Sequence, residues 1–183
     1  MAVLTEERTA LLGSDRSGKY LTFELGREVY GLPVLRIKEV VGMQTPAKVP
    51  HSPDYVQGVI NLRGKVIPII DLRMKFGMPS QEHTDRTCII VVQLKGRTSS
   101  GILAGAVVDK VSEVVMLSTA DIEDTPDFGD GTTLPYVLGI AKTKDGVRIL
   151  VDPDVLFEIP HLTEAHGLGN PAGPLSEGLP GAV

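Results

Sequence analysis

Between residues 18 and 160, hydrophobic and polar positions alternate with a period of two over several short segments. This period is typical of β-strands that bury one face. In residues 19–25 (KYLTFEL), Leu21, Phe23 and Leu25 point to one face, and the residues between them point to the other. Gly26 and the two polar residues after it predict a hairpin turn into a second strand.

Further apolar segments are rich in β-branched residues and end at Gly, Asp or Pro, which favours strands over helices. These segments are VIPIIDL (66–72), TCIIVVQL (87–94), GILAGAVVD (101–109) and VRILVD (147–152). Short helical turns are expected at residues 33–38, 72–76 and 153–157. Asp152 is the expected N-cap of the last turn, with Pro153 at its first position. Many short strands separated by turns predict an all-β barrel or sandwich.

The chain also contains an internal repeat. Residues 55–58 (YVQG) return as residues 136–139 (YVLG). Several later positions also match at the same spacing, and we call this pairing of positions the downstream alignment. Before this segment, residues 31–41 match residues 105–115 in a second register, which we call the upstream alignment. Two similar units in one chain predict two similar small barrels.

The expected organisation is therefore a pair of barrels between two tails. The segment after residue 160 is rich in Gly and Pro, and this composition is typical of disorder. The expected units are a flexible N-terminal arm, a first barrel, a second barrel and a disordered tail, at residues 1–17, 18–84, 85–160 and 161–183.

Composition and charge limit the partners and the compartment. Eighteen Lys and Arg residues against 23 Asp and Glu residues give a net charge of −5, which disfavours general binding to nucleic-acid phosphates. Cys88 is the single cysteine, so an intrachain disulfide is excluded, and it begins an apolar strand where a small buried residue is expected. The apolar segments are shorter than a membrane span, and the charged N-terminus does not suit a signal peptide. We expect a cytoplasmic protein.

Few residues suggest catalysis. Residues 13–19 (GSDRSGK) resemble a phosphate-binding loop, but Tyr20 stands where Ser or Thr would bind magnesium. The histidines lack metal-ligand spacing, and no cofactor or metal is expected. One enzyme alternative stays open, with a site built from Asp71, Asp109 and Asp152. These aspartates end strands, where capping is the simpler role.

The most distinctive block is residues 58–76 (GVINLRGKVIPIIDLRMKF). Arg63 and Gly64 predict a tight hairpin between two apolar strands, because Gly64 can adopt a positive φ. Pro68 has no backbone N–H, which indicates a sheet edge or a bulge. Arg63 has two interpretations: a solvated turn residue, or a side chain held against Glu39 by charge-assisted hydrogen bonds.

At this block the sequence resembles the CheW family, the coupling proteins of bacterial chemotaxis. The resemblance covers about residues 18–160 and is carried by YLTFELGREVYGLPVLRIKEVV, GVINLRGKVIPIIDLR, GAVVDKVSEVV and GIAKTKDGVRILVD. It implies an all-β fold of two similar five-stranded SH3-like β-barrels with a few short helices. It also implies a non-catalytic scaffold that couples transmembrane chemoreceptors to the histidine kinase CheA and lets receptor state control autophosphorylation.

Carried over by motif position, the resemblance implies two binding sites. Ile37 and Glu39 would face the regulatory domain of CheA, with Arg63 supporting Glu39. The residues expected to line a groove for the helical tip of a receptor are Gly58, Ile90, Val108 and Val111. The apolar members of both sets also fit ordinary core positions, and Gly58 also fits a bulge. The protein would be cytoplasmic and recruited to membrane-associated receptor arrays.

Three alternatives remain beside this interpretation. Two belong to the class of binding modules: a free-standing regulatory domain of the kinase type, and a CheW-like adaptor of another chemosensory pathway, such as one for pilus motility. The third is the small β-barrel enzyme with the three aspartates.

Overall fold

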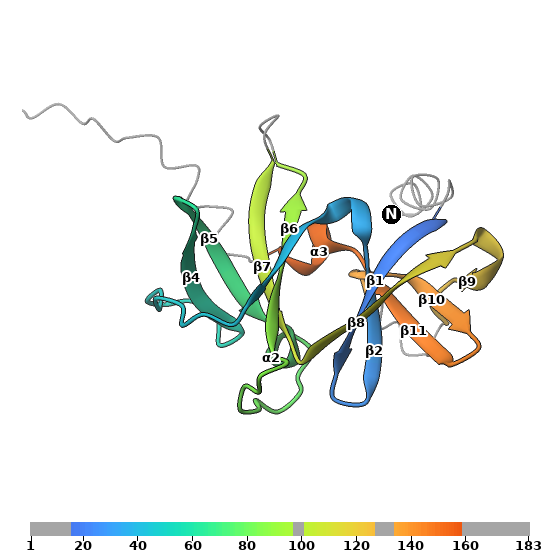
Figure 1. Ribbon diagram of the computed structural model, residues 1–183, viewed down its shortest axis with the longest axis horizontal. Helices are drawn as coiled ribbons and strands as arrows, with labels where there is room; N and C mark the ends of the chain where they lie inside the picture. The colour runs from blue at the N-terminus through green and yellow to red at the C-terminus, as the bar shows by residue number, and fades with distance from the viewer. Residues whose placement is uncertain (1–15, 97–100, 127–133, 159–183) are drawn as a thin grey trace, which may run out of the picture.

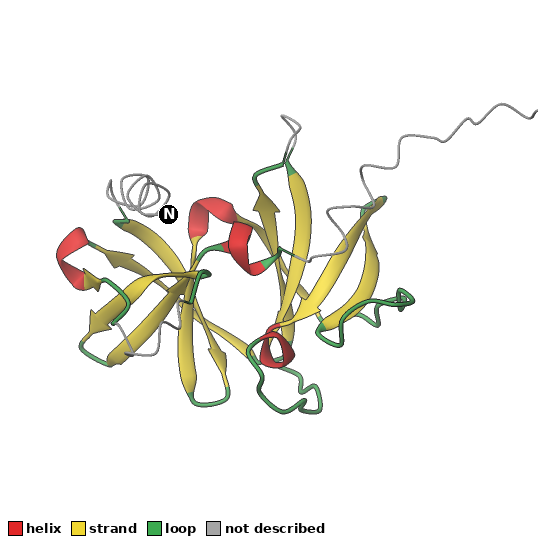
Figure 2. Ribbon diagram, turned by 180° about the vertical axis from the view of Figure 1, so that it is seen from behind, coloured by secondary structure: helices red, strands yellow, loops and turns green. Residues whose placement is uncertain are grey.

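The structure is a computed structural model that describes residues 16–96, 101–126 and 134–158. Strands dominate, and the helical segments are single turns (Figure 2). This confirms the all-β expectation. The expected tail at 161–183, and all of the expected arm except residues 16 and 17, lie outside the described residues.

The elements follow one another in a simple order. They are β1 (Gly18–Leu25), β2 (Glu28–Pro33), η1 (Val34–Arg36), β3 (Ile37–Gly42), β4 (Val56–Leu62), β5 (Lys65–Asp71), α2 (Leu72–Lys75), β6 (Cys88–Leu94), β7 (Ile102–Val108), β8 (Lys110–Leu117), η2 (Thr119–Asp121), β9 (Ile122–Glu123), β10 (Val137–Thr143), β11 (Gly146–Val151) and α3 (Pro153–Leu156).

The strands form two sheets, which lie side by side (Figure 1). One sheet has the order β3-β6-β7-β5-β4, and we call it the central barrel because its strands occupy the middle of the chain. The other has the order β8-β1-β2-β11-β10-β9, and we call it the terminal barrel. It has one strand more than the expected five because the two-residue β9 adds to it.

The two barrels are not consecutive stretches of the chain. Hairpin β1–β2 lies in the first sequence repeat but pairs with β8 and β11, while hairpin β6–β7 lies in the second repeat but pairs with β3 and β5. Each repeat therefore donates one hairpin to the barrel of the other. The expected boundary at residues 84/85 separates the repeats but not the sheets. Local alternation does not specify pairing partners, because every strand offers the same backbone hydrogen-bonding groups.

Equivalent contacts hold both exchanged hairpins. β5 runs parallel to β7 with Ile69 beside Gly105, and β11 runs parallel to β2 with Leu150 beside Gly31. A Cβ atom on Gly105 would lie 2.5 Å from Ile69 Cδ1, and one on Gly31 would lie 2.8 Å from Leu150 Cδ2. The absence of a side chain at both glycines therefore lets a large aliphatic residue pack across the parallel strands.

Strand β1 is buried on both faces, whereas the sequence predicted one polar face. Phe23 and Leu25 pack between the barrels, and on the opposite face Tyr20 and Thr22 are also buried. The expected polar face is wrong because this strand lies between the main core and the interior of the terminal barrel. Thr22 satisfies its hydroxyl by donating to the Glu113 carbonyl at 2.9 Å.

Two other local predictions need correction. The helical turn expected at residues 33–38 ends at Arg36, and β3 begins at Ile37. Pro68 lies in β5, which is flanked by β4 and β7 and is not an edge strand. β7 pairs with β5 only from residue 69 onward, so Pro68 precedes the part of the strand that this ladder uses.

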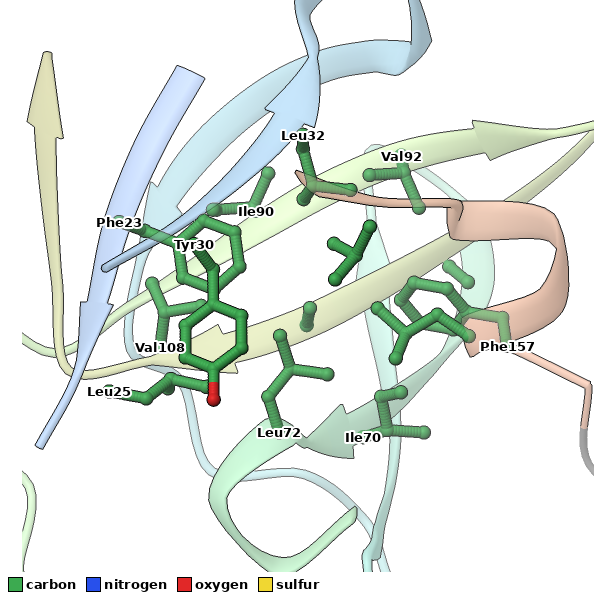
Figure 3. Close-up of a cluster of buried hydrophobic side chains, with 14 residues drawn as sticks. Phe23, Leu25, Tyr30, Leu32, Ile70, Leu72, Ile90, Val92, Val108 and Phe157 are labelled. Atoms are coloured by element: carbon green, nitrogen blue, oxygen red, sulfur yellow. The ribbon is translucent and has the colours of Figure 1, made fainter. Parts of the chain in front are cut away.

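The largest buried cluster lies between the barrels (Figure 3). Its labelled members are Phe23, Leu25, Tyr30, Leu32, Ile70, Leu72, Ile90, Val92, Val108 and Phe157. The cluster that fills the central barrel is Ile60, Ile67, Ile69, Ile89, Val91 and Val107. The cluster of the terminal barrel is Tyr20, Leu117, Ile122, Ala141 and Leu150. Since strands of both barrels contribute to the first cluster, hydrophobic burial joins the barrels into one unit.

The helical turns α2 and α3 are capped in the same way. Asp71 accepts a hydrogen bond from Met74 N at 3.3 Å, and Asp152 accepts one from Asp154 N at 2.9 Å. Pro153 occupies the first turn of α3, which confirms the cap predicted there. Within the described ranges, no helix has the length and apolar character needed to cross a membrane.

Candidate functional site

The Arg63–Gly64 hairpin forms the tight turn that the sequence predicted. Leu62 and Lys65 pair across it, and Arg63 and Gly64 have φ values of 52° and 84°. Gly64 N donates to Asn61 Oδ1 at 2.9 Å, which stabilises the turn. Positive φ at both central residues is the geometry that matches the twist of two-residue hairpins.

Arg63 reaches the opposite edge of its sheet. Its Nη1 donates to Glu39 Oε1 at 3.0 Å, and the side chains are 77% and 20% exposed. Glu39 lies on β3 and Arg63 follows β4, and these strands are the two edges of the central barrel. The ion pair therefore spans the open side of the barrel. Both interpretations of Arg63 therefore hold: the side chain pairs with Glu39, and it remains a largely solvated turn residue.

The same edge carries exposed apolar residues. Val40, next to Glu39, is 43% exposed, and Val66, in the β4–β5 hairpin, is 69% exposed. Lys38 and Lys65 are exposed on the same two elements. We call this set, with Glu39 and Arg63, the central edge face, after the edge strands that carry it; on β3 the Val40 side chain points to the other side of the strand from Glu39. Its exposed valines and accessible ion pair make it the candidate protein-binding surface.

Ile37, which the resemblance placed with Glu39 in the kinase-facing set, lies apart from this face. It starts β3, where a register shift separates it from Glu39, and its half-buried side chain packs on the core between the barrels. Val111 holds the equivalent place near the start of β8 in the upstream alignment, and it packs on the same core. We call Ile37 and Val111 the junction residues.

Two residues expected to line a receptor groove are inaccessible. Ile90 is 0% exposed and Val108 is 1% exposed, and both belong to the core between the barrels. Their expected direct contact with a partner needs correction, because neither side chain offers surface to one. Strand alternation alone does not separate such positions from a surface groove, since both place apolar residues on one face.

Gly58 is also covered by the chain itself. It is buried at a bulge in β4 with a φ of 133°, and a Cβ atom there would lie 2.1 Å from the Ala47 carbonyl oxygen. The expected groove position is therefore a bulge that closely approaches another backbone segment. Of the four residues expected to meet a receptor, Val111 is the one with an accessible side chain.

The three aspartates of the enzyme alternative have separate structural roles. Asp71 and Asp152 cap α2 and α3. Asp109 does not cap a helix but accepts hydrogen bonds from Arg73 Nε at 2.7 Å and Nη2 at 2.8 Å. Among the described residues, no group of three or more His, Cys, Asp or Glu side chains is arranged to hold a metal ion. Burial raises the pKa of the Cys88 thiol, so this residue has the character of an unreactive packing residue.

The chain passes from one barrel to the other at two places, from β2 through η1 to β3 and from β7 to β8, and we call these places the crossings. Each crossing is held by a bidentate ion pair that the sequence did not indicate. Arg36 in η1 donates to both carboxylate oxygens of Asp154 in α3, at 2.8 and 2.5 Å. Arg73 in α2 holds Asp109 between β7 and β8. Burial alone would raise the pKa of both aspartates, but hydrogen bonds from the arginines and from backbone N–H groups outweigh it and keep each pKa below its ordinary value.

A third ion pair, which the sequence also did not indicate, lies in the terminal barrel. Arg148 Nη2 donates to Glu113 Oε1 at 3.1 Å, and the arginine side chain is only 8% exposed. Glu113 matches Glu39 in the upstream alignment. The repeat could therefore have predicted a second glutamate on an edge strand. Arg148 lies in an apolar strand pattern, where one polar residue is expected to face solvent, so its burial was not predictable.

Comparisons with known proteins agree with the fold and with the motifs. The CheW-like domain family matches residues 19–160. The chain is 34% identical over 147 residues to the chemotaxis protein CheW of Klebsiella aerogenes, covering 80% of this chain and 86% of that protein. It is 30% identical over 140 residues to chemotaxis protein CheW of Bacillus subtilis, covering 76% and 86%.

A solved structure gives the same result. The crystal structure of the scaffolding protein TtCheW from Thermoanaerobacter tengcongensis superposes with a TM-score of 0.69 at 37% identity, covering 79% of this chain and 94% of that one. The family match, the identities and the two barrels agree with one another. The chain therefore belongs to the CheW family of chemotaxis scaffold proteins.

Proposed function

We propose that this protein is a non-catalytic adaptor that joins chemoreceptors to the histidine kinase CheA. The central edge face binds the regulatory domain of the kinase, and the junction between the barrels binds the cytoplasmic tip of a receptor. The adaptor works in the cytoplasm and is recruited to receptor arrays through these contacts. The observation that carries the proposal is the exposed Arg63–Glu39 pair on the open edge of the central barrel.

Arg63 supports this role because its ion pair contributes little to the stability of the fold. A non-glycine residue in the left-handed region costs roughly 1–2 kcal/mol, and an exposed ion pair contributes about 0–1 kcal/mol. The arginine nevertheless occupies a turn position at φ 52°. The hairpin geometry accounts for this φ, so the feature that supports a partner role is the exposed guanidinium group held beside Glu39.

The receptor contact rests on the junction residues. Val111 has accessible apolar surface and packs on the core between the barrels, and Ile37 holds the equivalent place. An amphipathic helical tip presents apolar side chains at helical spacing, which such half-buried aliphatic residues can receive. Ile90 and Val108 contribute indirectly, because they support the junction from the core.

The absence of catalysis is part of the proposal. The aspartates that the enzyme alternative needs are engaged in helix capping and in the Arg73 pair, so none of the three is left to act on a substrate. Purified protein should neither hydrolyse ATP nor accept phosphate from phosphorylated CheA. Stoichiometric labelling of this chain by the kinase would contradict this.

A double-mutant cycle tests the kinase contact. Affinity for the regulatory domain of CheA is measured by calorimetry for Glu39→Ala, Arg63→Ala and the double variant. The matched control is Lys144→Ala, an exposed residue at the equivalent position of the β10–β11 hairpin. We expect each single variant to weaken binding by about tenfold, or about 1.4 kcal/mol. The double variant should lose less than the sum of the singles, since each partner depends on the other. Unchanged kinase affinity in both single variants would overturn this part of the proposal.

The receptor contact needs a separate pair of variants. Val111→Lys places a charge at the junction, while Val114→Lys places the same charge on the same strand at a residue that is already 54% exposed. We expect Val111→Lys to weaken binding of a receptor-tip fragment and to leave kinase binding intact, with Val114→Lys retaining receptor binding. Equal receptor affinity for the two variants would show that the junction is not the site.

A further inference from the structure

We propose that Arg36 and Asp154 are positioning residues that fix the places of both proposed binding sites, the central edge face and the junction. Arg73 and Asp109 position the junction alone. This inference rests on the proposed function of the two sites. It assigns the two crossings between the barrels different roles, although they are built from equivalent elements.

The first crossing runs from β2 through η1 into β3. Arg36 holds Asp154 with both ends of its guanidinium group, and its Nε donates to the Gln93 carbonyl at 3.0 Å. Lys95 N donates to Asp154 Oδ1 at 2.8 Å. These contacts join three parts of the molecule: the crossing itself, α3 of the terminal barrel, and the end of β6 in the central barrel.

The second crossing runs from β7 into β8 and mirrors the first. Asp109 accepts two hydrogen bonds from Arg73 of α2, and its Oδ2 also accepts one from Gly26 N, in the β1–β2 turn, at 2.8 Å. In both crossings a carboxylate therefore binds an arginine and a backbone N–H of the exchanged hairpin.

The charges are reversed between the two crossings. Arg73 and Asp154 are equivalent in the downstream alignment, so α2 supplies the cation in one pair and α3 supplies the anion in the other. On the crossing itself, Asp109 is equivalent to Leu35 in the upstream alignment. Leu35 is 98% exposed. The first crossing therefore has, in place of the aspartate, a side chain that packs against almost nothing.

The sites that follow each crossing explain the different roles. Arg36 directly precedes Ile37 and closely precedes Glu39, so one short segment carries the ion pair, a junction residue and the kinase-facing glutamate. Among the described strands, β3 and β8 are both edge strands with a single pairing partner, so few backbone contacts fix where either strand starts. Asp109 closely precedes Val111, and no kinase-facing residue of the central edge face lies on β8.

The test uses the full chain with Asp154→Asn and Asp109→Asn, which keep the side-chain shape and remove the charge. Affinities for the kinase regulatory domain and for a receptor-tip fragment are measured beside the melting temperature. We expect Asp154→Asn to weaken both affinities by about fivefold, whereas Asp109→Asn weakens receptor binding alone by about fivefold. Glu39→Ala, measured in parallel, reports separately on the proposed kinase site.

Two outcomes would overturn the inference. In one, Asp154→Asn leaves kinase affinity unchanged while Glu39→Ala reduces it, so the proposed site stands and the positioning role fails. In the other, both asparagine variants lower both affinities in proportion to their loss of melting temperature, which is the behaviour of pairs that only stabilise the fold. If Glu39→Ala also leaves kinase affinity unchanged, the proposed kinase site itself fails, and the positioning role fails with it.

Discussion

The two barrels share an edge glutamate but supply its arginine from different places. In the central barrel, Glu39 binds Arg63, which lies on a hairpin turn with a 77% exposed side chain. In the terminal barrel, Glu113 binds Arg148, whose side chain is 8% exposed and whose Nε has no hydrogen-bond partner. Arg148 occupies the position that Ile67 holds in the central barrel, by the downstream alignment.

This difference shows how one fold can serve two purposes. The central barrel has an aliphatic interior, so its arginine is left on the surface, where a partner can reach it. The terminal barrel uses its arginine internally, where a charge must be paired to be tolerated. Similar sheets and an equivalent glutamate therefore carry an exposed ion pair in one barrel and an ion pair with a buried arginine in the other.

The sharpest way to break the comparison is to exchange the interior residues. Ile67→Arg puts a charge into a cluster of isoleucines and valines, where Glu39, the equivalent of Glu113, is already paired with Arg63. We expect a loss of more than about 3 kcal/mol in unfolding free energy. Arg148→Met fills the equivalent space without a charge and should be neutral or stabilising by about 1 kcal/mol. Urea unfolding measures both, and a mild effect of Ile67→Arg would show that the interiors are interchangeable.

The equivalent bulge glycines should also differ. Gly58→Ala places a Cβ atom 2.1 Å from a backbone oxygen at a φ of 133°, and we expect it to lower the unfolding free energy by about 3 kcal/mol. Gly139 has an ordinary φ, but a Cβ atom there would lie 2.8 Å from the Glu123 carbonyl oxygen, so Gly139→Ala should cost about 2 kcal/mol, from the steric contact alone. Equal losses in thermal or urea unfolding would contradict the difference in backbone conformation.

The edge glutamates should separate stability from binding. Glu113→Ala leaves the buried Arg148 without its closest carboxylate, and we expect it to cost about 2 kcal/mol of stability. Glu39→Ala should cost less than about 1 kcal/mol, while it is the variant expected to weaken kinase binding. A larger stability loss for Glu39→Ala than for Glu113→Ala would reverse the roles assigned to the two pairs.

The smallest effect concerns pH and the two crossings. The pKa values of Asp109 and Asp154 lie below their ordinary value, so both ion pairs stabilise the fold at neutral pH. This contribution is lost as the pH falls through about 4 and towards the lower folded-state pKa. Asp109→Asn and Asp154→Asn should each flatten the dependence of the melting temperature on pH between about 3 and 6, by similar amounts. A steeper dependence in either variant would show that the sign is wrong.

Local signals in the sequence were enough to predict the major strands, the Arg63–Gly64 turn and the Asp152 cap. Alternation and β-branched residues located the major strands, because side-chain direction in a strand depends on immediate neighbours. The Arg63–Gly64 turn and the Asp152 cap follow from the conformational preferences of single residues and of the few around them. The motifs of residues 58–76 indicated the family for the same reason: they are contiguous.

Part of the candidate site was predictable and part was not. The pairing of Arg63 with Glu39 was one of two interpretations, and the family resemblance favoured it. Core positions for Ile90 and Val108 and a bulge at Gly58 were among the interpretations. The sequence did not choose between core and groove, because an apolar strand position has the same local pattern in both. The Arg36–Asp154 pair joins residues 118 positions apart, and the motif that contains Arg36 gives no sign of its distant partner.

The sequence by itself determined that this protein is built from two similar all-β units of the CheW family. Only the tertiary structure decided that each unit donates a hairpin to the other barrel, which residues are covered as a result, and which arginine remains exposed. The physical reason is that strand formation and turn geometry depend on neighbours along the chain. Pairing, burial and charge contacts instead depend on which of several locally equivalent strands pack together, and this is settled by the packing of the whole chain.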